Sequence, residues 1–131
     1  MKYANGVLLD MPCHLALCVD ERAYRREMRR LKIDEHPPFT INGKPATAHW
    51  FNHQQGGQNL AIVCVDRETL ADRTGTQIAA LLVHEAVHVF QNICEHLGEE
   101  SPSREFEAYS IQRIAQNLMH MYAELSEGGT K

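Results

Sequence analysis

The chain has 131 residues, of which 44% are hydrophobic and 23% are charged, and its formal net charge is −4. This length fits one domain built on one core, residues 1–131. The negative charge argues against a nucleic-acid-binding protein with a broad basic surface, and no apolar run reaches the roughly 20 residues of a membrane-spanning helix.

The N-terminal stretch MKYANGVLLDMPC has no apolar run long enough for a secretion signal, so a cytoplasmic location is expected. The chain has four cysteines and no C-x-x-C pair. In a reducing compartment such cysteines are expected as small buried hydrophobic residues. Eight histidines are a high number for this length, and they raise the question of a bound metal.

The first third of the chain predicts a strand and a helix. Residues 14–20, HLALCVD, alternate weakly and predict a strand, and Asp20 is placed to cap a helix over residues 21–32. His-Pro-Pro at 36–38 is expected to stop that helix. The helix carries a basic run interleaved with glutamates, which is typical of a solvated helix face; a patch that binds nucleic acid or a partner is the alternative.

The next segment predicts extended structure. Asn42-Gly43 is a type I′ hairpin signal between two short extended runs. A second turn at residues 54–58 leads to NLAIVCVD, residues 59–66, the best strand pattern in the chain. These elements predict a small mixed or antiparallel sheet of three to four strands.

Two long helices are predicted in the second half. TQIAALLVHEAVHVFQNICEHLG has helical character throughout, with Thr76 as its expected N-cap and Gly98 as its stop. Ser101-Pro102 is a cap followed by proline at the first helical position, and it opens a second helix. The predicted fold class is therefore α+β, a small sheet with a flanking helix packed on two long helices.

The first of these helices contains His84, Glu85 and His88 in the pattern H-E-x-x-H. Residues four apart on a helix lie on one face about 6 Å apart along the axis, so two imidazoles there can bind one ion. A glutamate next to the first histidine can reach a water on that ion without binding the ion itself. The helix is apolar nearly all round, so these polar side chains need a reason to be there.

Catalytic zinc sites use three protein ligands and leave the fourth position to water. The second helix carries two glutamates near its start, and a short turn between the helices makes them antiparallel neighbours. Glu107 shares its side of the helix with apolar residues and is the preferred third ligand; Glu105, which shares its side with polar residues, is the alternative.

His84-Glu85-x-x-His88, then eighteen residues, then Glu107-Ala108, resembles the gluzincin zinc metallopeptidases. The resemblance implies one zinc ion per chain on His84, His88 and Glu107, with Glu85 as the general base that activates the attacking water. It also implies a preceding strand that lines the substrate cleft, for which NLAIVCVD is in the right place. Residues 46–122 are similar to small uncharacterised metallopeptidase-like proteins of phages and prophages.

The pattern departs from the zincin families in three respects. Ile111 stands where thermolysin-like members have an aspartate that orients a zinc histidine. The later positions of the metzincin motif are Gln91 and Cys94 here, which excludes that family. Larger gluzincins stabilise the oxyanion with a His or Tyr from a C-terminal domain, which is not expected here. Tyr109, His49 and His53 are therefore the local candidates for this role.

The expected function is zinc-dependent hydrolysis of a peptide or protein substrate, with a peptide added as a strand beside Ala61–Val65. The alternative is a non-catalytic zinc protein of zincin-like fold, acting as a phage-type binding or regulatory module. A helical interaction protein without metal is the third hypothesis.

Overall fold

The computed structural model describes residues 1–4, 13–54 and 58–129. Within these ranges a mixed four-stranded sheet has the order β1-β2-β4-β3, formed by β1 (Lys2–Tyr3), β2 (Cys13–Cys18), β3 (Ala46–Gln54) and β4 (Gln58–Val65). β2 and β4 pair in parallel, whereas β1 and β3 pair antiparallel to their neighbours. The α+β class and the mixed sheet are thus confirmed.

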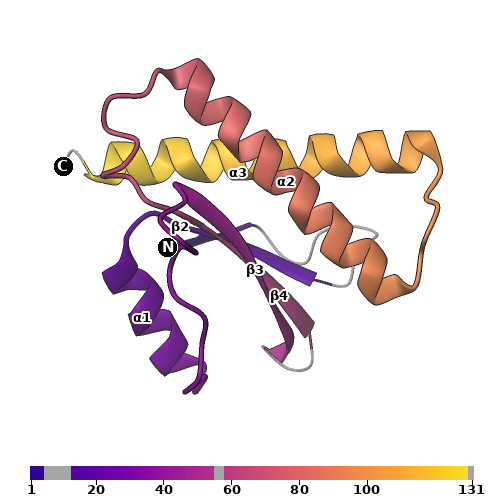
Figure 1. Ribbon diagram of the computed structural model, residues 1–131, viewed down its shortest axis with the longest axis horizontal. Coiled ribbons are helices and arrows are strands. Elements are labelled where there is room, and N and C mark those ends of the chain that lie inside the picture. Colours follow the sequence, from indigo (N-terminus) through magenta and orange to yellow (C-terminus); the bar gives the residue numbers. More distant parts are fainter. Residues whose placement is uncertain (5–12, 55–57, 130–131) are drawn as a thin grey trace.

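The sheet is covered on both faces. α2 (Gly75–Leu97) and α3 (Arg104–Gly129) lie on one side, and α1 (Glu21–Arg30) lies on the other (Figure 1). The central strands alternate accordingly: Val63 packs toward α2 and α3, while Ile62 packs toward α1. This alternation follows from the two-residue period of a strand. All four cysteines are buried and free, as the sequence predicts.

α1 is shorter than predicted and does not end at the prolines. Its N-cap is Asp20, as predicted, and the Asp20 carboxylate accepts from Ala23 N–H at 2.7 Å. The helix ends because Lys32 adopts a left-handed conformation (φ 59°) and Ile33 N–H donates to Met28 O, which is a Schellman-type ending.

Asn42 and Gly43 both have positive φ, and Lys44 N–H donates to Ile41 O at 3.0 Å, so the type I′ turn forms. It does not connect two strands, because the residues before it are not part of the sheet. The prediction of a hairpin at this point is therefore wrong. The predicted turn at 54–58 falls largely on residues 55–57, outside the described residues.

α2 begins two residues earlier than predicted. Thr74, not Thr76, is the N-cap, because its hydroxyl accepts from Gln77 N–H while the Gln77 side chain accepts from Thr74 N–H. This reciprocal capping box requires Gln or Glu three residues after the cap, and Ala79 stands there for Thr76. Gly98 ends the helix with φ 72°, as predicted. None of the helices in the described ranges combines the length and apolarity needed to cross a membrane.

Candidate metal centre

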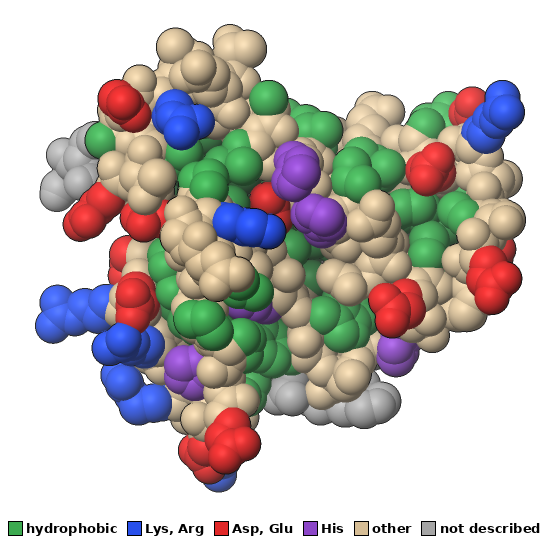
Figure 2. Space-filling view, viewed as in Figure 1, with side chains coloured by type: hydrophobic (Ala, Val, Ile, Leu, Met, Phe, Trp, Pro, Cys, Tyr) green, Lys and Arg blue, Asp and Glu red, His purple; other side chains and the backbone are tan. Residues whose placement is uncertain are grey.

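His84 and His88 lie one turn apart on the side of α2 that faces away from the core. The buried residues of α2, among them Leu82, Ala86 and Ile93, lie on the opposite side of the helix and pack against the sheet and α3. Both histidines are exposed. Figure 2 shows two adjoining histidine side chains on this face, with a basic and an acidic side chain beside them.

The two imidazoles point at each other through the atoms that bind metals. His84 Nε2 and His88 Nε2 are 3.2 Å apart, and their ring centroids are 4.8 Å apart. Two nitrogens about 2.05 Å from a tetrahedral zinc ion would be about 3.3 Å apart. The pair therefore fits two positions around zinc, and without an ion the same geometry lets the two nitrogens share a proton.

Gln91 fixes the orientation of the second histidine. Its Oε1 lies 3.1 Å from His88 Nδ1. An amide oxygen can only accept, so Nδ1 carries the proton and Nε2 keeps its lone pair. This is the arrangement in which a hydrogen bond to one ring nitrogen prepares the other for a metal. The sequence does not name this partner, although Gln91 is three residues after His88 on the same face.

Glu85 lies between the histidine pair and the sheet, and it is 4% exposed. Burial raises the pKa of its carboxyl group, and this rise is opposed by the two neighbouring histidines, by Lys44 and by a hydrogen bond from the backbone N–H of Ala48. Ala48 belongs to β3, so Glu85 connects the helix that carries the histidines to the edge of the sheet.

A cleft of about 330 Å³ opens beside the pair, between α2 and β3. It is lined from one side by Ile41, Lys44, Ala46, Thr47 and Ala48, and from α2 by His84, Glu85, His88, Gln91, Asn92 and Glu95. Lys44 and Glu95 were not among the residues that the sequence predicts for the site. Glu95 could have been found, because it lies seven residues after His88 and thus on the same helix face.

The strand beside the cleft is β3 and not the predicted Ala61–Val65. β4, which contains Ala61–Val65, lies between β2 and β3, and both of its edges are paired. A strand in this position has no free edge to which a peptide could add. The prediction of Ala61–Val65 as the peptide-binding strand is therefore wrong. Among the described strands β3 forms this edge of the sheet, and its Ala48 N–H is already bonded to Glu85.

The structure does not bring Glu107 to the histidine pair. Glu107 lies in the first turn of α3, is exposed, and acts electrostatically on Cys94 of α2. Cys94 is six residues from His88, about 9 Å along the axis and about 240° around it. Within residues 1–4, 13–54 and 58–129, no three His, Cys, Asp or Glu side chains, Glu105 included, are grouped so as to hold a metal ion.

Two of the three predicted candidates for stabilising an oxyanion, Tyr109 and His49, are separate from the cleft. Tyr109 is 67% exposed on α3, and His49 is buried on the sheet face covered by α1. The side chain of His53 lies outside the described part of the structure. Among the cleft residues, Lys44 is the cation beside Glu85.

Comparison with known proteins finds no match: no family model fits the chain, and neither a curated protein nor a solved structure matches it. The resemblance to gluzincins therefore rests on the motif residues alone.

Proposed function

We propose that the protein is a zinc-dependent peptidase whose metal is held by His84 and His88. The observation that carries this proposal is the 3.2 Å separation of the two Nε2 atoms, which matches two ligands of one tetrahedral ion. Both rings are exposed at a cleft, which supports an open, catalytic type of site, since structural zinc sites are closed by four protein ligands.

Glu107 is retained as the proposed third ligand on the gluzincin resemblance. Its carboxylate lies close enough to α2 to act electrostatically on Cys94. The adjoining residue Phe106 already packs on α2, with its ring 5.7 Å from that of Phe90. A helical first turn is also the part of α3 that adjusts most easily, because helix ends open at low cost.

A zinc ion in this position would acidify a water molecule and polarise a peptide carbonyl. Glu85 would accept the proton of the attacking water and deliver it to the leaving amine nitrogen. Its place beside the histidine pair and its hydrogen bond to β3 hold the carboxylate at the cleft. The edge of β3 on either side of Ala48, whose N–H donates to Glu85, would align the substrate backbone, since an extended peptide can add to a sheet edge.

The proposal is tested with purified, zinc-loaded protein and a mixture of fluorogenic peptides. We expect hydrolysis by the wild type and a loss of about 10²- to 10⁴-fold in Glu85→Gln, with the zinc content unchanged. Equal zinc content with no hydrolysis in either protein would instead support the non-catalytic zinc module. Absence of zinc from both proteins would contradict the proposal and support the third hypothesis, a helical interaction protein without metal.

A further inference from the structure

The cleft at the histidine pair is the middle of a longer groove between α2 and β3. Lys44 and His84 line both the central cleft and the hollow on one side of it, which extends to Arg73. Glu95 lines both the central cleft and the hollow on the other side, which extends to His96. The groove follows about 20 residues of α2, about 28 Å, which is the length of roughly eight extended residues.

The two ends of this groove carry opposite charges. Lys44 and Arg73 line one end, and Glu95 is the acidic side chain at the other. Among the described residues neither Lys44 nor Glu95 forms an ion pair, and Arg73 has one distant contact of 3.9 Å with Asp72. The charges of Arg73 and Glu95 are therefore available to a ligand, whereas Lys44 also acts on the Glu85 carboxylate in the same hollow.

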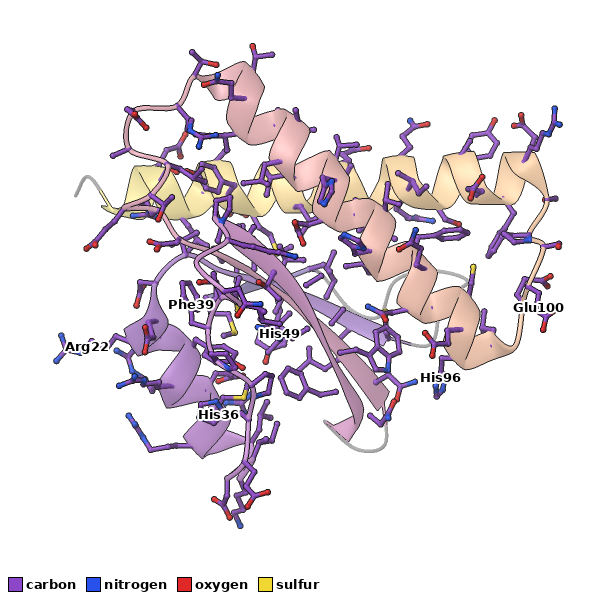
Figure 3. All side chains as sticks on the ribbon, in the orientation of Figure 1. Arg22, His36, Phe39, His49, His96 and Glu100 are labelled. Carbon is purple, nitrogen blue, oxygen red and sulfur yellow. The ribbon has the colours of Figure 1, made fainter. Side chains whose placement is uncertain are left out.

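The acidic end also contains a fixed aromatic ring. Trp50 lines it, and the indole N–H of Trp50 donates to Asn52 Oδ1 at 2.8 Å. The ring of His96, labelled in Figure 3 near the end of α2, lies 5.9 Å from that of Trp50. An indole face beside a carboxylate suits a Lys or Arg side chain, which gains both a cation–π contact and an ion pair.

We infer that the groove selects an extended peptide by the order of its charges, with a basic side chain at the Glu95–Trp50 end and an acidic one at the Lys44–Arg73 end. β3 runs from the basic end of the groove to the acidic end. Antiparallel pairing is the more stable ladder, and it places the N-terminal part of the peptide at the acidic end. The basic residue thus precedes the cleaved bond and the acidic residue follows it.

This inference rests on the proposed function for the position of the cleaved bond, but the binding preference itself needs no hydrolysis. It is tested by fluorescence anisotropy with two labelled octapeptides of the same composition, one with Lys near the N-terminus and Glu near the C-terminus, and one with the two exchanged. Wild-type protein is expected to bind the Lys-first peptide about three- to tenfold more tightly. The difference should shrink at high salt, because exposed charges are screened.

The matched variants are Glu95→Lys and Glu100→Lys, which change the charge equally. Glu100 is exposed beyond the end of α2, away from the groove (Figure 3). We expect the preference to vanish or reverse in Glu95→Lys and to persist in Glu100→Lys. Equal affinity for both peptides, no binding of either, or the same response in both variants would overturn the inference.

The variant His88→Ala separates this inference from the zinc proposal. A charge-order preference in both wild type and His88→Ala, with no zinc in either, would mean that the zinc proposal fails while the inference holds. Zinc binding and hydrolysis by the wild type without any preference between the peptides would mean that the zinc proposal holds while the inference fails.

Discussion

The buried His49 and the exposed pair His84–His88 lie in opposite environments, the first on the sheet under α1 and the second on α2. His49, labelled in Figure 3, is 6% exposed on the sheet face covered by α1, and its ring stacks on that of Tyr24 with centroids 5.6 Å apart. Its Nε2 lies 3.0 Å from Phe39 O. Burial lowers the pKa of His49, so the ring is held neutral inside the protein.

His84 and His88 are exposed, and their Nε2 atoms face each other instead of a protein acceptor. A structural histidine is therefore distinguished from a candidate metal ligand by the partners of its ring nitrogens, more than by its residue type. A buried ring with a backbone partner completes a core. Two exposed rings whose lone-pair atoms converge leave room for an ion.

The largest change in zinc affinity is expected when the proposed third ligand is removed. Glu107→Ala should weaken zinc binding about 100-fold or more, because removing a direct ligand costs more than removing a supporting contact. Competition with a chelator measures this affinity. Glu105→Ala is the matched control and should bind zinc like the wild type. Unchanged affinity in Glu107→Ala would show that the site is completed by another group.

A smaller effect is expected from the residue that orients His88. Gln91→Ala should lower zinc affinity about 10- to 100-fold, since the ring then loses the acceptor for its Nδ1 proton. Gln91→Glu keeps an acceptor and should retain the affinity. The same chelator competition applies, and Gln116→Ala, on α3, is the control. If Gln91→Ala bound zinc as well as the wild type, Gln91 would have no positioning role.

The contribution of the buried His49 to stability is tested by the variant His49→Phe. The variant should lower the free energy of unfolding by about 1–3 kcal/mol at pH 8, because Phe39 O loses its donor. The lowered pKa of His49 means that its contribution is complete above its unfolded value of about 6.5 and is lost as pH falls through the lower folded value.

Urea unfolding at pH 8 and pH 5 checks both statements. Wild type should lose more stability than His49→Phe over this range, with His120→Gln, an exposed histidine, as the control. Zinc affinity should be the same in all three proteins. A parallel loss of stability in wild type and His49→Phe would show that His49 does not carry the acid sensitivity.

The smallest change in stability is expected when the negative charge of the buried Glu85 carboxylate is removed. Glu85→Gln should stabilise the metal-free protein near neutral pH by roughly 0.5–2 kcal/mol, as single stabilising changes do. The raised pKa of Glu85 means that its favourable contribution is complete below its unfolded value and is lost as pH rises through the folded one. The gain should therefore grow from pH 4 to pH 7 in thermal unfolding with a chelator present. A gain that is independent of pH would contradict this explanation.

Local patterns predict part of this molecule well. The apolar run of β4 and the long periodic segments of α2 and α3 identify these elements, because burial and helical period leave a strong mark in sequence. The residues His84, Glu85 and His88 come together because they belong to one helix. Boundaries such as Thr74 depend on a capping box, which requires checking the third residue after each candidate cap.

Features that join distant segments could not be predicted in the same way. The position of β4 inside the sheet, and hence of β3 at its edge, depends on pairing between segments far apart in the chain. The place of Glu107 depends on the crossing of α2 and α3, which the spacing of the motif does not determine. Lys44 joins the cleft only because β3 lies beside α2.

The zinc site is tested by measuring the zinc content of purified wild type and His88→Ala after zinc is added and the excess removed. We expect about one zinc ion per chain in the wild type and none in His88→Ala, with both proteins folded by circular dichroism. No zinc in the wild type, or equal zinc in both proteins, would contradict this expectation.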